Sequence, residues 1–178
     1  MSRVISNLCL AGFMGTGKST IGRMSAESLQ YPLIDTDHWI ESAAGKTIAE
    51  IFQQEGEAAF RAWERKAVAE LAGKRDCVIS TGGGLIADTE NLASLKVHSL
   101  VVCLWASPEA IFERVKDQTH RPLLHSPDPL GKIRELLAGR MPAYRQADVL
   151  INTEDRHPRE VAFQVLHHFR DSRDGTAV

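Results

Sequence analysis

The residues Gly12–Ser19 read GFMGTGKS and match G-x-x-x-x-G-K-[ST], the pattern of a phosphate-binding loop. The apolar run Asn7–Ala11 precedes the loop and the amphipathic stretch Lys18–Gln30 follows it, so the loop joins a predicted strand to a predicted helix. Glycines let backbone N–H groups curl around phosphate oxygens, and the helix N-terminus adds its positive dipole end. Lys18 then reaches the outer phosphates, and the Ser19 hydroxyl can bind Mg²⁺. A chance match at a glycine turn is the alternative, and the strand–loop–helix context favours a nucleotide site.

Outside this loop, short apolar runs alternate with amphipathic stretches. Strands are predicted at Pro32–Asp35, Cys77–Ser80, Ser99–Leu104 and Val149–Asn152. Helices are predicted at Glu57–Leu71, at Ser107–Lys116 with Ser107 as N-cap and Pro108 in the first turn, and at Pro158–Phe169. Strands that alternate with helices indicate a parallel sheet with helices on both faces, which places the chain in the α/β class.

The composition is that of one globular domain without a strong charge bias. Of the 178 residues, 43% are hydrophobic, which is enough for one sizeable core. The 23 acidic and 21 basic side chains give a net charge of −2, so the basic excess of a nucleic-acid-binding surface is missing. The apolar runs are far shorter than the roughly 18 residues of a membrane span. We therefore expect neither a nucleic-acid partner nor a membrane.

The three cysteines indicate the compartment. Cys9, Cys77 and Cys103 lie scattered in apolar runs without a C-x-x-C pair, so neither a zinc site nor a disulfide framework is predicted. We expect buried reduced thiols in a cytoplasmic protein. The N-terminal apolar run leads directly into the phosphate loop, and we do not expect it to be a signal peptide.

Two aspartates follow the second predicted strand, in the stretch LIDTDHWIE. Ligands of α/β sheets bind beyond the carboxyl ends of strands, which is where Asp35 and Asp37 fall. If the strand continues, their spacing of two sends the side chains in different directions, one to a metal and nucleotide and the other to an acceptor. A phosphoryl acceptor needs a carboxylate to orient its hydroxyl and take its proton. The alternative for Asp37 is an N-cap of the next helix, and both roles are compatible.

Three arginines lie in motifs suited to anionic ligands. Arg61, in FRAWE, has Glu64 three residues on, where the carboxylate can brace the guanidinium. Arg121, in HRPLL, lies in the proline-containing excursion Asp117–Pro129, which is typical of a lid. Arg140 lies in GRMPAY. The planar guanidinium binds carboxylates and phosphates through two hydrogen bonds. For each arginine alone, a solvated surface charge is the alternative.

A second glycine run, Gly82–Gly84, ends the strand predicted at Cys77–Ser80. It is therefore predicted to face the same crevice as the first loop. Glycines have no side chain, so a substrate can approach their backbone N–H groups closely. A flexible turn after a buried strand is the alternative, and we expect the run to belong to the site of a second substrate.

Taken together, the motifs resemble those of the shikimate kinase family. In order along the chain they are GFMGTGKS, DTDHWIE, FRAWE, STGGG, RPLL followed by DPL, and RMPAY followed by AD. The resemblance covers about Asn7 to Phe169. It implies a three-layer α/β/α fold with a five-stranded parallel sheet in the order 2-3-1-4-5 and a mobile lid. We expect one domain over residues 1–178, with the lid at about 117–130, a frayed polar tail at about 171–178, and a monomer.

The resemblance also implies an activity. It is the transfer of the γ-phosphoryl group of ATP to the 3-hydroxyl of shikimate, giving shikimate 3-phosphate and ADP in aromatic amino-acid biosynthesis. Its partners would be the small molecules ATP and shikimate, with Mg²⁺ as cofactor. Two other interpretations are a related small-molecule kinase, of gluconate or nucleoside monophosphate type, and a nucleotide-binding sensor without turnover. The paired arginines and the DTD and GGG motifs favour a small polyhydroxy acid as acceptor.

The roles of the family fall on specific residues by motif. The resemblance implies catalytic roles for Lys18, Asp37 and Arg121. It implies ATP contacts for Gly12, Gly15, Thr16, Gly17, Lys18, Ser19, Thr20, Arg114, Arg121, Arg156 and Pro158. Mg²⁺ would be held by Ser19 and Asp35. Shikimate would be held by Asp37, Arg61, Gly82, Gly83, Gly84 and Arg140, in a pocket also lined by Phe52 and Phe60.

One segment departs from the family pattern. The family commonly has six residues from the tyrosine of R-x-P-x-Y through the aspartate of A-D, whereas YRQAD here has five, from Tyr144 to Asp148. This indicates a one-residue deletion after Arg140. The sequence does not determine the path of the chain from the segment that carries Arg140 into the last predicted strand.

Overall fold

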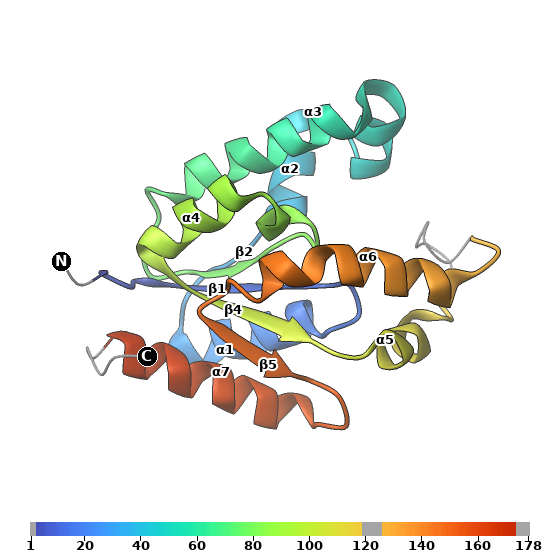
Figure 1. Cartoon of the computed structure of the whole chain (residues 1–178). Coiled ribbons are helices and arrows are strands. Elements are labelled where there is room, and N and C mark those ends of the chain that lie inside the picture. Colours follow the sequence, from blue (N-terminus) through green and yellow to red (C-terminus); the bar gives the residue numbers. More distant parts are fainter. Residues whose placement is uncertain (1–2, 119–125, 174–178) are drawn as a thin grey trace.

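The structure is a computed structural model that describes residues 3–118 and 126–173. Five parallel strands form one sheet in the order β2-β3-β1-β4-β5 (Figure 1). They are β1 (Asn7–Gly12), β2 (Leu33–Asp35), β3 (Val78–Ser80), β4 (Ser99–Trp105) and β5 (Val149–Asn152). Each strand falls where an apolar run predicted it, and the order is the one that the resemblance implied. The α/β class is confirmed.

Helices cover both faces of the sheet (Figure 1). On one face lie α1 (Lys18–Leu29) and α7 (Pro158–Arg173). On the other lie α3 (Ile48–Leu71), α4 (Thr89–His98), α5 (Pro108–Val115) and α6 (Pro129–Tyr144). A further helix, α2 (Thr36–Ala44), packs against α3, and the 3-10 turn η1 (Leu85–Ala87) leads into α4. The three predicted layers are therefore present.

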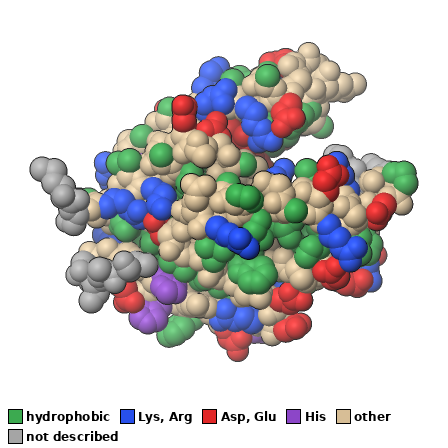
Figure 2. Space-filling model, in the orientation of Figure 1, with side chains coloured by type: hydrophobic (Ala, Val, Ile, Leu, Met, Phe, Trp, Pro, Cys, Tyr) green, Lys and Arg blue, Asp and Glu red, His purple; other side chains and the backbone are tan. Residues whose placement is uncertain are grey.

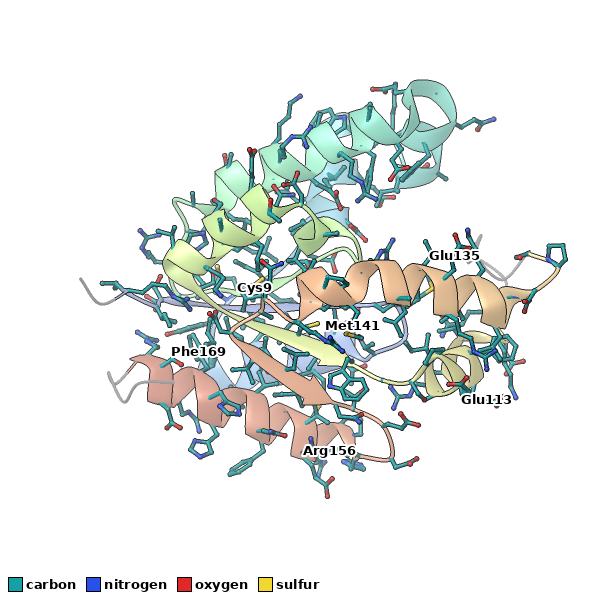
Figure 3. The ribbon with its side chains drawn as sticks, viewed as in Figure 1. Cys9, Glu113, Glu135, Met141, Arg156 and Phe169 are labelled. Atoms are coloured by element: carbon teal, nitrogen blue, oxygen red, sulfur yellow. The ribbon has the colours of Figure 1, made fainter. Side chains whose placement is uncertain are left out.

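The central strand β1 shows why helices must pack on both faces of the sheet. Leu8 and Leu10 point into the core shared with α1 and α7, while Cys9 and Ala11 point into the core on the opposite face. All four side chains are fully buried. Figure 3 shows Cys9 within the sheet and Phe169 between α7 and the sheet. A strand buried on both faces has a continuous apolar sequence, which is the pattern that predicted it.

The three cysteines lie in these cores as free thiols. Burial raises the pKa of the Cys77 thiol to about 11 and that of the Cys103 thiol to about 12. The buried state expected for them is therefore present, and the protonated form is strongly favoured at neutral pH.

The start of α5 agrees with the sequence prediction, whereas that of α3 does not. The Ser107 side chain accepts a hydrogen bond from the Ala110 backbone N–H at 3.2 Å and Pro108 opens α5, so this N-cap is confirmed. Helix α3 is interrupted at Gly56, whose φ of 81° lies outside the helical range. Helix α3 begins at Ile48, nine residues before the predicted start at Glu57, and the predicted range corresponds to the part that follows the kink.

The sequence prediction gave no residue range for α2, α4 and α6, although the alternative for Asp37 assumed a helix after this residue. Helix α4 begins at Asp88, whose side chain caps the backbone N–H groups of Glu90 and Asn91. Helix α6 contains Pro142 and two glycines, residues that usually weaken or end helices. Packing against the sheet overrides that local preference. Helix α7 also continues past its predicted end at Phe169 to Arg173.

The shortened segment Tyr144–Asp148 forms a tight turn into β5. The Ala147 N–H donates to the Tyr144 carbonyl at 3.1 Å, and the Asp148 N–H donates to Val101 of β4 at 2.9 Å. The Asp148 carboxylate accepts from the Val101 N–H at 2.8 Å and from the Arg3 guanidinium at 2.8 and 2.9 Å. These contacts fix the path into β5, which the sequence had left open.

Residues 119–125 of the predicted lid, Arg121 among them, lie outside the described part of the chain, whereas its last two residues, Pro129 and Leu130, belong to α6. None of the helices within residues 3–118 and 126–173 combines the length and the apolar composition needed to cross a membrane.

Candidate active site

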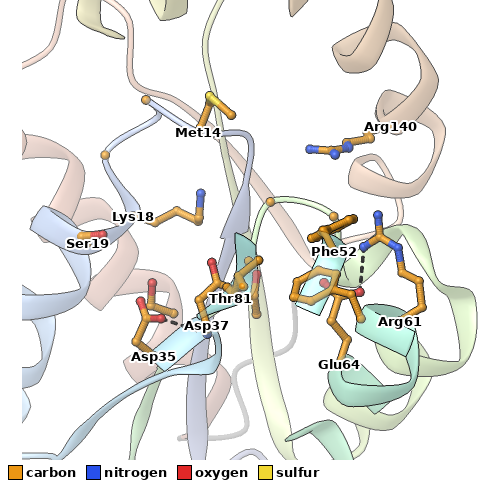
Figure 4. A pocket seen from close by; sticks show the side chains of 18 of the residues that line it. Met14, Lys18, Ser19, Asp35, Asp37, Phe52, Arg61, Glu64, Thr81 and Arg140 are labelled. Carbon is orange, nitrogen blue, oxygen red and sulfur yellow. Dashed lines mark hydrogen bonds and ion pairs between the residues drawn. The ribbon is translucent and has the colours of Figure 1, made fainter. Parts of the chain in front are cut away.

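One pocket lies beyond the carboxyl ends of β1, β2 and β3, between the first glycine loop, α3 and α6. In the space-filling view the molecule is hollowed between the lobe of α2 and α3 and the body that carries α6 (Figure 2). The pocket is lined by Met14, Gly15, Gly17, Lys18, Ser19, Thr20, Asp35, Asp37, Ile48, Phe52, Phe60, Arg61, Glu64, Ser80, Thr81, Gly82, Gly83, Gly84 and Arg140. Both glycine runs, both aspartates and two of the three predicted arginines therefore meet in one place (Figure 4).

The first loop is shaped by glycines in unusual backbone conformations. Gly12 has a φ of +132°, and a Cβ there would lie 2.1 Å from the Leu104 carbonyl oxygen. Gly17, with a φ of +98°, caps the start of α1. The buried Thr16 hydroxyl donates to the Phe13 carbonyl at 2.7 Å and braces the loop. This leaves the loop curled in front of the α1 N-terminus, the arrangement that binds phosphate.

Lys18 lies across the mouth of this loop. Its Nζ donates to the carbonyl oxygens of Gly12 at 2.7 Å and Phe13 at 2.9 Å. Figure 4 shows Lys18 on the same side of the pocket as Ser19 and Asp35. The ammonium is therefore placed next to the position of a phosphate bound in the loop.

Ser19 and Asp35 offer a hydroxyl and a carboxylate on that side, and hard oxygen ligands of this kind suit Mg²⁺. Within the described residues, no cluster of three or more His, Cys, Asp or Glu side chains could hold a metal by itself. Mg²⁺ usually binds through one or two carboxylates together with water and substrate phosphates, so two protein ligands are enough. The donor set fits the ion.

Asp35, not Asp37, is the N-cap of α2, which corrects the alternative considered for Asp37. The Asp35 Oδ1 accepts from the Asp37 N–H at 3.0 Å and the His38 N–H at 3.2 Å. The strand also ends at Asp35, so strand alternation does not separate the two side chains. The first turn of α2 does so instead, and it carries Asp37 toward the middle of the pocket.

Asp37 is a strongly perturbed carboxyl group in the pocket. Burial, together with the nearby negative charge of Asp35, raises its pKa to about 6, and the positive charge of Lys18 partly opposes this shift. Within the described residues its buried Oδ1 has no hydrogen-bond partner. A carboxylate with a pKa near neutrality and an unpaired oxygen is suited to accept a proton from a substrate hydroxyl.

Arg61 and Glu64 form a braced pair on α3. The Arg61 Nη1 donates to Glu64 Oε2 at 2.7 Å, and Nη2 donates to Glu57 Oε1 at 2.9 Å. Burial raises the pKa of Glu64, against the lowering effect of its bond to Arg61. The predicted support of Arg61 by Glu64 is confirmed. Arg140 of α6 lies across the pocket from Lys18 (Figure 4). Its guanidinium stacks over Phe13, 5.2 Å from the ring centre.

Each glycine of the second run lies against one polar side chain of the pocket. A Cβ at Gly82 would lie 2.5 Å from Asp37 Oδ1, and one at Gly84 would lie 2.8 Å from Arg61 Nη1. At Gly83 the contact would be 3.3 Å, with Arg140 Nη1. The bare Cα atoms therefore make room for three charged side chains, a reason for the glycines that the sequence did not reveal.

Other predicted residues lie at the edge of this pocket or away from it. Phe52 and Phe60 line it as predicted, with ring centres 4.8 Å apart. Arg114 contacts the first loop through the Gly15 carbonyl at 3.2 Å. Arg156 bonds to Asn152 and Gln164 near the start of α7 at Pro158, and neither it nor Pro158 lines the pocket (Figure 3).

Sequence reasoning missed several residues of the site, namely the lining residues Met14, Ile48, Ser80 and Thr81, and Tyr144 behind the pocket. Thr81 lines the pocket, and within the described residues its buried hydroxyl has no partner. Tyr144 lies behind the pocket, where its hydroxyl donates to the Gly83 carbonyl at 2.6 Å. Thr81 precedes the glycine run directly, which was a usable signal. Nothing local in the sequence pointed to the Tyr144 contact, because the residue is distant along the chain.

Comparisons with known proteins agree with this site. The family model described as shikimate kinase matches residues 14–170. A shikimate kinase of Thermodesulfovibrio yellowstonii is 42% identical over 171 residues, 96% of this chain and 99% of the relative. The structure of a shikimate kinase from Acinetobacter baumannii in complex with shikimate superposes with a TM-score of 0.88 and 37% identity, covering 96% of both chains.

A gluconokinase from Sinorhizobium meliloti has a TM-score of 0.64 at 18% identity, covering 98% of this chain and 97% of the other, and this likeness shows the shared fold alone. The match of the family model over most of the chain, together with the close relatives, decides between the families. The chain belongs to the shikimate kinase family.

Proposed function

We propose that this chain transfers the γ-phosphoryl group of ATP to the 3-hydroxyl of shikimate, giving shikimate 3-phosphate and ADP. The observation that carries the proposal is the two-sided pocket. A phosphate loop with Lys18 forms one side, two arginines form the other, and Asp37, with its pKa of about 6, lies between them. The relatives named as shikimate kinases, and the solved Acinetobacter baumannii structure in complex with shikimate, support the same substrate.

On the nucleotide side, the backbone of Gly12–Thr20 would hold the phosphates of ATP, and Lys18 would neutralise the charge on the transferring group. Ser19 and Asp35 are the residues that would hold Mg²⁺, Asp35 directly through its second oxygen or through water. When bound, the ion neutralises phosphate charge and orients the β- and γ-phosphates. Arg114 contacts the loop from outside and would stabilise its shape on the adenine side.

On the acceptor side, Arg61 and Arg140 would bind the shikimate carboxylate through bidentate hydrogen bonds. Asp37 would orient the 3-hydroxyl and accept its proton. The hydroxyl oxygen forms a bond to the γ-phosphorus while the bond from that phosphorus to the β,γ-bridging oxygen breaks, and its electron pair leaves with ADP. Gly83 and Gly84 would contribute backbone N–H groups to the acceptor.

Further parts of the proposal rest on the sequence. Arg121 would add a positive charge beside the transferring phosphoryl group, in a lid at about 117–130 that excludes water. Residues 1–178 would form one domain that works as a monomer. The three buried free thiols support a cytoplasmic location, where thiols stay reduced.

A substrate panel tests the function. Purified protein is assayed by coupled ADP release with ATP and Mg²⁺ and, side by side, with shikimate, quinate, gluconate and a nucleoside monophosphate. We expect turnover with shikimate to exceed that with the other acceptors by orders of magnitude. Preferred turnover of gluconate would replace the proposal with a gluconate-type kinase. Nucleotide binding without acceptor-dependent turnover, and without shikimate binding in calorimetry, would favour a sensor.

A further inference from the structure

Tyr144 joins the end of α6 to the second glycine run. Its side chain is fully buried in the core beneath the pocket, and its hydroxyl donates a hydrogen bond of 2.6 Å to the Gly83 carbonyl. Burial raises the pKa of this hydroxyl to about 12, so it stays protonated and remains a donor at neutral pH. A short bond between two buried groups, far apart along the chain, fixes the direction of the Gly83 carbonyl.

The direction of this carbonyl decides where the next N–H points. The Gly83 C=O and the Gly84 N–H belong to one planar trans peptide, in which they point in opposite directions. Because Tyr144 holds the C=O toward the core, the Gly84 N–H is held away from it, on the side where Gly83 and Gly84 line the pocket. Within the described residues, no backbone acceptor for this N–H is present.

The same contact sets the spacing between the second glycine run and the arginines. Arg140 lies one turn before Tyr144 on α6, and its Nη1 would be 3.3 Å from a Cβ at Gly83. Arg61 approaches Gly84 in the same way, at 2.8 Å. A shift of the Gly83–Gly84 peptide would therefore change the position of an N–H donor and the space available to both guanidinium groups.

We propose that Tyr144 is a positioning residue for the acceptor. Its hydroxyl fixes the Gly83–Gly84 peptide so that the Gly84 N–H and the Arg61 and Arg140 side chains converge on one carboxylate-bearing substrate. This role rests on the proposed function of the pocket. Tyr144 does not line the pocket, and it acts through the glycine run and through the side-chain hydrogen bond that its hydroxyl shares with Arg140.

The first test compares Tyr144→Phe with Tyr31→Phe. The chain has two tyrosines, and the Tyr31 hydroxyl donates to Asp76 at 2.9 Å, away from the pocket. Each variant loses one hydroxyl group and the hydrogen bond that it donates. We expect Tyr144→Phe to raise the KM for shikimate about 3- to 10-fold, the effect of one net hydrogen bond. The KM for ATP stays unchanged, and Tyr31→Phe alters neither constant.

A tyrosine that only fills the core gives a different result. Tyr144→Phe would then lower the melting temperature and leave the KM for shikimate at its wild-type value. Equal increases in the KM values for ATP and shikimate would indicate a general loosening of the pocket. Either result overturns the positioning role.

The second test does not depend on turnover. Glycine-selective ¹⁵N labelling gives amide resonances for the 13 glycines, and those of Gly83 and Gly84 are assigned from their loss in alanine variants. In substrate-free Tyr144→Phe we expect these two resonances to move while those of the remote Gly45 and Gly73 do not. Unmoved resonances in a folded variant overturn the role. If they move although the wild type does not phosphorylate shikimate, the proposed function fails and the positioning contact stands.

Discussion

The two glycine runs of the pocket use glycine for opposite physical reasons. In the first run, Gly12, Gly15 and Gly17 all have positive φ values, a backbone conformation that residues with a Cβ rarely adopt. In the second run, none of Gly82, Gly83 and Gly84 has a positive φ. There the space for a Cβ is missing at Gly82 and Gly84, where Asp37 and Arg61 occupy it, and it is tight at Gly83, next to Arg140.

The difference separates backbone shape from side-chain placement. The first run bends the chain so that N–H groups face a phosphate, and its glycines are required whatever surrounds them. The second run has an ordinary conformation and gives three charged side chains close access to one another. Substitutions in the first run should therefore affect folding or nucleotide binding, whereas those in the second should affect the acceptor.

Among substitutions within the two runs, the largest effect is expected for Lys18→Met, which removes the cation of the first run. We expect kcat to fall by about a hundredfold or more, as for the loss of one preorganised charge from a transition state. Shikimate binding by calorimetry and the circular dichroism spectrum should remain those of the wild type. Turnover close to the wild-type value would show that Lys18 does not stabilise the transferring phosphoryl group.

Gly12→Ala tests the claim about backbone shape. The alanine would need a φ of +132° and would place its Cβ 2.1 Å from the Leu104 carbonyl oxygen. We expect a loss of about 2–3 kcal/mol in the free energy of unfolding, measured with urea. Gly84→Ala, the matched control, should lose much less, because the atom that its Cβ meets is the end of a flexible side chain. Equal losses would erase the distinction between the runs.

Gly84→Ala and Gly83→Ala test the claim about side-chain placement. A Cβ at Gly84 would lie 2.8 Å from Arg61 Nη1 and would displace this atom. A Cβ at Gly83 would lie 3.3 Å from Arg140 Nη1, which needs to move only slightly. We expect the KM for shikimate to rise about tenfold for Gly84→Ala, equal to about 1.4 kcal/mol, and less for Gly83→Ala. The KM for ATP should hardly change. A parallel rise in both KM values would mean that the second run also shapes the nucleotide side.

The smallest expected change is one in the free energy of unfolding, and it concerns the charge of Asp37, which lies between the two runs. Its pKa of about 6 is above the ordinary 3.8, so the folded state binds the proton more tightly than the unfolded state. Ionisation therefore destabilises the fold as pH rises from about 4 to 6. We expect Asp37→Asn to be more stable than the wild type by about 1 kcal/mol at pH 8, with the difference vanishing by about pH 4.

The same pKa predicts the acid limb of the activity profile. The wild-type kcat/KM for shikimate should fall as pH drops below about 6, because the proton acceptor becomes protonated. Asp37→Asn should bind ATP normally and lack turnover at every pH. Normal turnover by this variant would leave Asp37 without a catalytic role, and a constant stability difference from pH 4 to 8 would contradict the raised pKa.

The strands and the first loop were predictable because their signals are local. Cys9 and Val101 lie in apolar runs that are buried on both faces, and the phosphate loop is a contiguous motif. Helix α6 was missed because Pro142 argues locally against a helix, while its packing on the sheet is a tertiary effect. The cap at Asp35 was missed because the strand ends at this residue and does not continue to Asp37, as alternation would require.

Many of the residues that line the candidate site could be predicted from the motifs, whereas Arg156 and Pro158 do not line it and most contacts within the site could not be predicted. Arg61 and Glu64 are three residues apart on one helix, so their bond could be inferred from spacing. The approach of Arg140 to Gly83, and the bond from Tyr144 to the same glycine, join residues distant along the chain. Only the packing of α6 on the sheet brings them together, and no local pattern encodes that distance.

The central position of β1 has a consequence for folding. Leu8 of β1 pairs with Val78 of β3 on one side and with Leu100 of β4 on the other, so the strand that carries the first loop completes its pairing only through distant segments. Contacts of such high sequence separation form slowly, because a long loop must close before they contribute stability. A nascent chain that ends before β3 therefore presents the phosphate loop without its neighbouring strands. Because β1 and β3 pair in one sheet and each leads into one glycine run, we expect the nucleotide and acceptor sides of the pocket to form together when the sheet is completed.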